Sequence, residues 1–162
     1  MKSEEETTNK SDDSTKNICP DKVTASNEVS VEVCEQHDTV TKISFDSLGV
    51  CDALVEACTN MGWTSATLIQ EKVLIDALNG RDIIGLAETG SGKTGAFCIP
   101  MLQALLNNPI RGAVFGVVLA PTRELAFQIH KVVEGLGATM GATSLCIVGG
   151  VPVTQQSIAL GR

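Results

Sequence analysis

Apolar and polar positions divide the chain into two parts that differ in periodicity. Residues 1–41 are rich in Ser, Thr, Asp, Glu, Lys and Asn, and they contain no Phe, Trp or Leu. A segment of this composition buries too little apolar surface to offset the entropy that its ordering would cost. The pattern therefore predicts a disordered acidic tail over residues 1–41, in which only the alternation between Val29 and Val33 fits a short strand.

Beyond residue 42, apolar positions recur with a helical period in some segments and form short continuous runs in others. In residues 52–61, Leu54, Val55 and Cys58 fall on one helical face, and a glycine follows the segment. The run 114–120 is apolar throughout, which is typical of a strand buried on both faces. The expected elements, in chain order, are helix 52–61, helix 67–78, strand 82–87, helix 93–107, strand 114–120, helix 123–136, strand 144–148 and helix 153–160. This alternation predicts an α/β fold in which a parallel sheet is flanked by helices.

Net charge adds little to this picture. The chain carries 12 Lys and Arg against 19 Asp and Glu, a formal net charge of −7. Residues 1–42 hold five Lys and ten acidic residues, whereas residues 43–162 hold seven basic and nine acidic residues. The folded part is near neutral and has no basic patch, so charge alone does not indicate nucleic-acid binding.

Several classes of protein are disfavoured by the composition. The charged start of the chain lacks the apolar stretch of a secretory signal. The longest apolar run, 113–120, is too short to cross a bilayer. Six cysteines occur without the spacing of a metal site. We therefore expect an intracellular soluble protein with free thiols and no membrane association.

Residues 87–94 carry the strongest chemical signal in the chain. They read Ala-Glu-Thr-Gly-Ser-Gly-Lys-Thr, which matches the phosphate-loop pattern G-x-x-x-x-G-K-[ST] except for Ala87 in the first position. Small residues let consecutive backbone N–H groups wrap a phosphate chain, and the following helix adds its positive end. Lys93 supplies an ammonium for the β- and γ-phosphates, and the Thr94 hydroxyl suits Mg²⁺. The segment predicts binding of a nucleoside triphosphate with Mg²⁺, with Lys93 and Thr94 as the catalytic residues.

Four segments, in order along the chain, resemble motifs of the DEAD-box family of ATP-dependent RNA helicases. The matching segments are a Q motif at 62–70 with Phe45 upstream of it, motif I at 87–94, motif Ia (Pro-Thr-Arg-Glu-Leu-Ala) at 121–126, and the GG motif at Gly149-Gly150. The resemblance implies an incomplete RecA-like P-loop domain, an α/β fold with a parallel sheet and flanking helices. We therefore divide the whole chain into a disordered acidic tail (1–41), a Q-motif helical region (42–80) and a truncated RecA-like ATP-binding domain (81–162).

By this resemblance the nucleotide is ATP. Gln70 has an amide able to pair with adenine N6 and N7, a contact that discriminates by about 1–3 kcal/mol, and Phe45 stacks on the adenine face. The alternatives are a core anchor for Phe45 and a solvent-facing helix position for Gln70. The implied ATP site comprises Phe45, Thr67, Gln70, Ala87, Thr89, Gly90, Ser91, Gly92, Lys93 and Thr94, with Thr94 on Mg²⁺.

The resemblance also implies binding of single-stranded RNA. The implied contacts with the sugar–phosphate backbone come from Pro121, Thr122, Arg123, Gly149 and Gly150. Because such contacts carry no base information, we expect binding that is independent of sequence. The stretches 85–97 and 123–129 are most similar to the subgroup that acts in nucleolar ribosomal-RNA processing. This similarity implies a monomer that works in the nucleus, within the nucleolus, together with pre-ribosomal assembly factors. The alternative location is the cytoplasm.

Complete members of the family are RNA-stimulated ATPases that separate RNA strands. Ala66 replaces the proline of the Q motif, which we expect to loosen the turn before Gln70. The chain ends at Arg162, before the D-E-A-D segment that acts in hydrolysis. We therefore expect these 162 residues to bind ATP without hydrolysing it or unwinding RNA. Two alternatives stay open: another P-loop enzyme, such as a nucleotide kinase or a GTPase, and a non-enzymatic truncated fragment that binds RNA or a protein partner.

Overall fold

The computed structural model describes residues 31–33, 42–109 and 114–161. The elements are β1 (Val31–Val33), η1 (Asp46–Leu48), α1 (Asp52–Asn60), α2 (Leu68–Leu78), β2 (Ile84–Leu86), α3 (Lys93–Asn107), α4 (Arg123–Gly137), η2 (Ala138–Met140) and α5 (Val153–Leu160). The sequence-based prediction of five helices is confirmed, and each helix begins within one residue of the expected position. The predicted disordered tail lies outside the described residues, except for the strand β1.

Local signals in the sequence account for the helix boundaries. The α4 helix begins after Thr122, whose Oγ1 accepts a hydrogen bond from the N–H of Leu125 at 3.2 Å. The α2 helix begins with a comparable contact, because Gln70 Oε1 accepts from the N–H of Thr67 at 2.9 Å. Gly92 precedes α3 with φ of +94°, a backbone conformation that favours glycine. These contacts satisfy N–H groups that would otherwise lack partners at a helix start.

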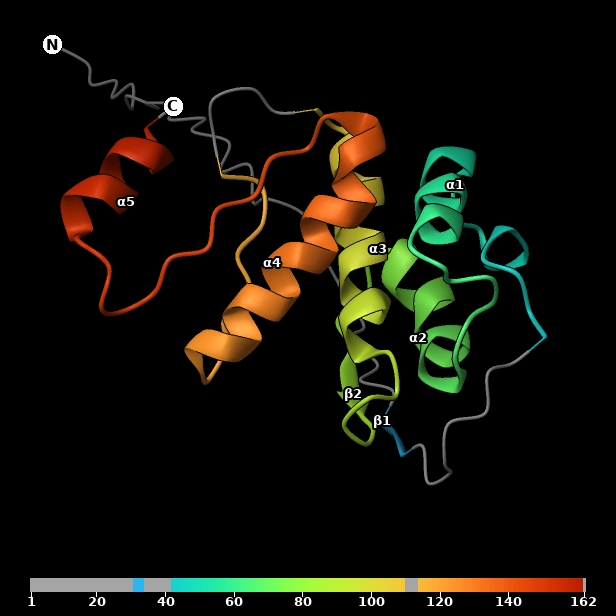
Figure 1. Ribbon diagram of the computed structural model, residues 1–162. Helices are drawn as coiled ribbons and strands as arrows, with labels where there is room; N and C mark the ends of the chain where they lie inside the picture. The colour runs from blue at the N-terminus through green and yellow to red at the C-terminus, as the bar shows by residue number, and fades with distance from the viewer. Residues whose placement is uncertain (1–30, 34–41, 110–113, 162) are drawn as a thin grey trace, which may run out of the picture.

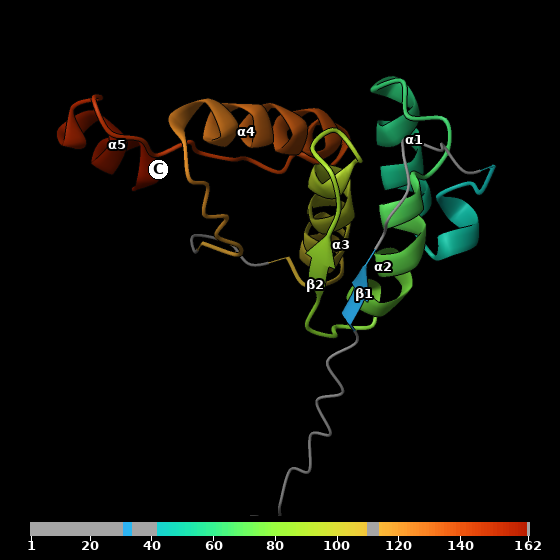
Figure 2. The ribbon, with the colours of Figure 1, turned by 90° about the horizontal axis from the view of Figure 1, so that it is seen from below.

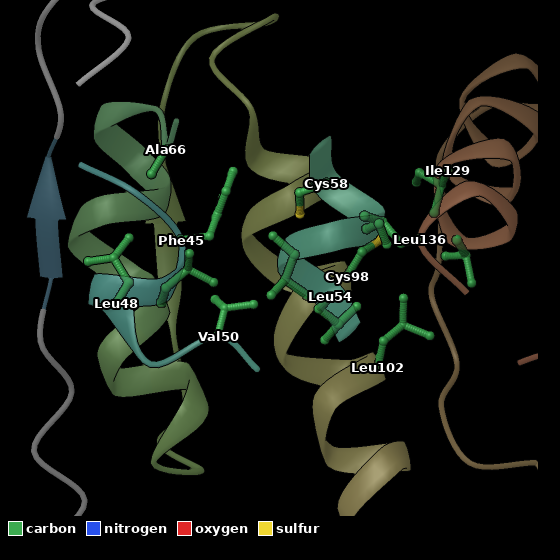
Figure 3. Packing of buried hydrophobic residues seen from close by; sticks show 14 residues of the cluster. Phe45, Leu48, Val50, Leu54, Cys58, Ala66, Cys98, Leu102, Ile129 and Leu136 are labelled. Atoms are coloured by element: carbon green, nitrogen blue, oxygen red, sulfur yellow. The ribbon is translucent and has the colours of Figure 1, made fainter. Parts of the chain in front are cut away.

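The core lies where the first four helices meet. Figure 1 and Figure 2 show α3 between α2 on one side and α4 on the other, with α1 close to both α2 and α4. Figure 3 shows how apolar side chains from these helices and from the segment before α1 fill the space between them. The fully buried large residues are Leu54, Leu74, Ile99, Leu136, Cys58 and Cys98. The helical apolar faces read from the sequence therefore build one cluster.

The sheet is smaller than the sequence predicts. The described strands β1 and β2 pair in parallel, with Val31 opposite Ile84 and Val33 opposite Leu86, and Figure 2 shows the pair beside α2 and α3. The predicted strands at 114–120 and 144–148 are wrong, because neither segment forms a strand. A strand in the middle of a sheet depends on hydrogen bonds along both edges. Within the described part of the chain, no strand pairs with either segment, so neither joins a ladder.

The predicted burial of 114–120 on both faces is also wrong. Val117 is 75% exposed and Leu119 is 91% exposed. Side chains of this kind gain their stability from apolar contact rather than from the backbone conformation alone. The segment is apolar, as the sequence shows, but no described residue covers these side chains, so they are exposed to solvent.

The last helix stands apart from the core. Every residue of α5 is described, and none of them is buried. Figure 1 shows α5 at the end of a long extended segment that leaves α4. None of the described helices combines the length and apolar character needed to cross a membrane.

Candidate functional site

The predicted phosphate loop forms the turn between β2 and α3. Gly90 and Gly92 have φ of +90° and +94°, so the turn uses conformations that other residues rarely adopt. Lys93 extends back over the turn, and its Nζ donates to the carbonyl oxygens of Ala87 and Glu88 at 2.5 Å each. The ammonium therefore lies within the loop, at the place where the sequence predicts phosphate oxygens.

The start of α2 packs directly against this loop. Gln70 is 3% exposed, and while its Oε1 accepts from Thr67, its Nε2 donates to the carbonyl oxygen of Gly92 at 3.0 Å. A Cβ built on Gly92 would lie 2.6 Å from Thr67 Oγ1 and 2.9 Å from Gln70 Nε2. The solvent-facing alternative for Gln70 is thus wrong: its amide joins the Q-motif region to the phosphate loop.

Trp63 and Gly95 are part of the same contact, although neither was predicted to be a site residue. A Cβ built on Gly95 would lie 2.5 Å from Gln70 Nε2 and 2.9 Å from Cζ3 of the Trp63 ring. The first turn of α3 therefore needs a glycine here to admit both side chains. The chain has a single tryptophan, and its position in the Q-like segment was a signal that could have identified it.

One hydroxyl group in the loop is left without a partner. Ser91 Oγ is buried and has no hydrogen-bond partner among the described residues, whereas the Thr67 side chain faces the backbone N–H of Gln70 in a capping box. An unsatisfied buried polar atom costs about 1–3 kcal/mol, so such atoms at a glycine-rich turn indicate a place for a polar ligand. Together with the Lys93 ammonium and the Thr94 hydroxyl, this donor set fits phosphate oxygens and a hydrated Mg²⁺.

Phe45 lies in the core rather than at the surface. Its side chain is 2% exposed, and Figure 3 shows it beside Leu48 and Val50. This placement corresponds to the core-anchor alternative, and stacking on adenine stays a prediction that requires the ring to become accessible. Nearby, the N–H of Ala66 donates to the carbonyl oxygen of Ile43 at 2.9 Å. A proline could not make this bond, so the turn before Gln70 is held by a contact that Ala66 permits.

The predicted RNA-binding residues come from two separate segments that meet. A Cβ built on Gly150 would lie 2.9 Å from Nη1 of Arg123, so the guanidinium rests against the glycine turn. Thr122 caps α4 immediately before Arg123. The other two predicted residues, Pro121 and Gly149, adjoin this contact in the chain, and all five residues are exposed or partly exposed. The geometry therefore gathers motif Ia and the GG turn on one accessible surface.

The thiols with shifted pKa values belong to the core and not to this site. Burial raises the pKa of Cys58 to about 11 and the pKa of Cys98 to about 12. Both thiols therefore stay protonated at neutral pH, where they pack as small apolar groups. They contribute no nucleophile.

A comparison with protein families identifies the chain. A family model described as DEAD/DEAH box helicase matches residues 67–162. The chain belongs to this family. The match includes the start of α2 and the phosphate loop, which contact each other, and motif Ia and the GG turn, which also contact each other.

Curated relatives agree with this assignment. A human protein named "Probable ATP-dependent RNA helicase DDX47" is 51% identical over 143 residues, which cover 88% of this chain and 30% of the relative. The "ATP-dependent rRNA helicase rrp3" of Emericella nidulans is 57% identical over 119 residues, which cover 74% of this chain and 25% of the relative. The chain thus spans less than a third of the length of each of these relatives.

Solved structures show the same fold. The RNA helicase Prp28 of Chaetomium thermophilum, bound to ADP, has a TM-score of 0.67 at 33% identity; the match covers 75% of this chain and 30% of that one. The S. cerevisiae Dbp5 variant L327V, bound to RNA and ADP BeF3, has a TM-score of 0.59 at 32% identity. This match covers 68% of the present chain and 29% of the Dbp5 chain. The fold is therefore a partial RecA-like domain of the helicase type, rich in helices and with only part of a sheet.

Proposed function

We propose that the chain is the ATP-binding front part of a DEAD-box ATP-dependent RNA helicase. The observation that carries the proposal is the contact of Gln70 with Gly92, because it places an adenine-reading amide one residue from the phosphate-binding Lys93. A loop built only to bind phosphate has no need of this amide. The activity proposed for the whole protein is RNA-stimulated ATP hydrolysis coupled to strand separation.

The phosphate chain binds in the turn that Lys93 now occupies. The ammonium exchanges the carbonyl oxygens of Ala87 and Glu88 for the β- and γ-phosphates, and the positive N-terminal end of α3 lies next to the same turn. The Thr94 hydroxyl would hold Mg²⁺, and the ion would supply positive charge beside the phosphates. The unpartnered Ser91 hydroxyl gains a polar neighbour when this ligand is present.

Adenine recognition uses the hydrogen-bonding capacity that Gln70 has left. The carboxamide oxygen accepts two hydrogen bonds and its nitrogen donates two, yet each makes one in this structure. The second bond of each suits adenine N6 and N7, so Gln70 reads the base without releasing Gly92. Stacking by Phe45 completes the pocket after its ring moves out of the core.

RNA binding uses the surface where Arg123 meets Gly150. The guanidinium is exposed and planar, as contacts with a phosphodiester require, and the glycines allow close approach of a backbone. The proposed contact residues are Pro121, Thr122, Arg123, Gly149 and Gly150. Because relatives are named rRNA helicases, we place the protein in ribosome biogenesis, in the nucleus and nucleolus, with pre-ribosomal assembly factors as partners.

Titration of Trp63 fluorescence with nucleotide tests the ATP site. The ring packs at the start of α3, so its emission should change when MgATP binds. We expect MgATP to bind more tightly than MgGTP, Lys93→Ala to weaken both, and Gln70→Ala to reduce the preference for ATP. Tighter binding of MgGTP by the parent chain would instead favour a different P-loop enzyme. Anisotropy of a labelled single-stranded RNA, with Arg123→Ala as the variant, tests the RNA surface separately.

A further inference from the structure

One side chain holds the turn that contains the two glycines. Gln156, in α5, accepts a hydrogen bond through Oε1 from the N–H of Val148 at 2.8 Å. Its Nε2 donates to the carbonyl oxygens of Val148 at 3.2 Å and of Val151 at 3.1 Å. One amide thus binds the backbone on both sides of Gly149 and Gly150.

The conformation of this turn decides where Arg123 lies. Gly150 has φ of +85°, and its Cα faces the guanidinium closely enough that a Cβ would meet Nη1 at 2.9 Å. The segment before the turn is tied to α4 at its other end, because Ser144 Oγ and His130 Nδ1 form a hydrogen bond. A shift of the turn would therefore remove the surface that supports Arg123.

The position of α5 separates this role from support of the core. Every residue of the helix is described and none is buried, and Figure 1 shows the helix away from α1 to α3. The hydrogen bonds of Gln156 reach only the turn next to it in sequence. Removal of its amide should consequently leave the nucleotide site and the core intact.

We infer that Gln156 is a positioning residue for RNA binding. Its amide fixes the Gly149–Gly150 turn, against which the Arg123 guanidinium packs. The inference rests on the proposed RNA-binding function. A carboxamide is required because the turn presents one N–H and two carbonyl groups to the same side chain. A carboxylate would satisfy the N–H but repel both carbonyl oxygens, and a thioether would satisfy none of the three.

The experiment compares Gln156→Met with Gln155→Met in the 162-residue chain. Gln155 is the neighbouring, exposed residue of α5, so it receives the same substitution without loss of the three bonds. Binding of a fluorescein-labelled oligouridylate is measured by anisotropy over a range of salt concentrations, and MgATP binding is measured by Trp63 fluorescence. Arg123→Ala and Gln156→Glu complete the set.

We expect Gln156→Met to weaken RNA binding about three- to tenfold, as loss of one or two modest hydrogen-bonding contacts would. The slope of log affinity against log salt should fall by about 0.7, the value for one phosphate contact on a single strand. Gln156→Glu should fall between Gln156→Met and the parent chain. Gln155→Met should match the parent chain, and MgATP affinity should stay unchanged throughout.

Three other outcomes would contradict parts of this reasoning. Normal RNA binding by Gln156→Met, together with weakened binding by Arg123→Ala, would overturn the role of Gln156 and leave the proposed RNA surface standing. Parallel losses of RNA and MgATP binding by Gln156→Met would show a general structural role and would overturn the inference as well. Absence of RNA binding by the parent chain, or no effect of Arg123→Ala, would refute the proposed RNA surface itself.

Discussion

Two glycine-to-alanine substitutions in helices should have opposite effects on stability. Alanine in a helix is favoured over glycine by up to about 1 kcal/mol, and this gain applies both to Gly95 in α3 and to Gly135 in α4. The neighbours differ. A Cβ on Gly95 would lie 2.5 Å from Gln70 Nε2 and 2.9 Å from Trp63, whereas a Cβ on Gly135 would lie 2.8 Å from Met61 Sδ.

The neighbours decide the net free energy in each case. Met61 is partly exposed and has an unbranched side chain that can shift, so Gly135→Ala should stabilise the chain by about 0.5 kcal/mol. Gln70 is 3% exposed and bonded to Gly92, so it has little room to move. Overpacking costs about 1–3 kcal/mol, and the strained amide bond adds about 1 kcal/mol. We therefore expect Gly95→Ala to destabilise the chain by about 1–3 kcal/mol.

Urea unfolding followed by Trp63 fluorescence measures both variants. The same samples should show weaker MgATP binding for Gly95→Ala, because displacement of Gln70 also moves its partner in the phosphate loop. Normal MgATP affinity and equal stability gains for the two variants would refute the packing of α2 against the start of α3. A loss of stability in Gly95→Ala with normal MgATP affinity would support the packing but would refute its connection with the nucleotide site.

Three further substitutions and one change of pH test the core and the loops. Leu54→Ala, at a position that is 0% exposed, should cost about 2–5 kcal/mol in urea unfolding, while Leu119→Ala, at a position that is 91% exposed, should change stability by less than about 0.5 kcal/mol. Gln103→Met should cost about 1–3 kcal/mol in the same assay, because it removes hydrogen bonds to the backbone at residues 49 and 51. Stability should also fall as pH rises above about 9. Thiols in the unfolded chain ionise near their ordinary pKa of 9.0, whereas burial raises the pKa of Cys58 to about 11 and the pKa of Cys98 to about 12. Urea unfolding at about pH 8 and at about pH 10 measures this loss of stability, which should be smaller when both Cys58 and Cys98 are replaced by alanine.

The sequence predicts the helices well because their signals are local. The bounds predicted for α3 match the structure, since a glycine-rich turn precedes the helix and Asn108-Pro109 follows it. Amphipathic spacing also selects the buried face of α1, where Leu54 and Cys58 enter the core. These features depend on residues within a few positions of each other, which a single sequence records completely.

The strands and the site contacts depend on residues that are distant in sequence, and here sequence reasoning loses accuracy. An apolar run such as 114–120 indicates a preference for burial but does not specify the strand that pairs with it. Burial of Phe45 and Gln70 likewise depends on how α2 meets α3, which periodicity does not give. The sequence does not single out Gln156, because its partners are backbone groups, which every sequence contains.

Three glutamines share one arrangement that bears on how the site changes state. Gln70, Gln103 and Gln156 each accept from one backbone N–H and donate to a carbonyl oxygen of a loop. A carboxamide does this without the desolvation cost of a buried carboxylate. Gln70 in this way holds the loop at Gly92, and Gln156 holds the turn at Gly149–Gly150. One hydrogen bond contributes about 1 kcal/mol net to stability, whereas truncation of a large core side chain costs several times more. A rearrangement of the loop at Gly92 or of the turn at Gly149–Gly150 would therefore cost less than a change in the apolar cluster.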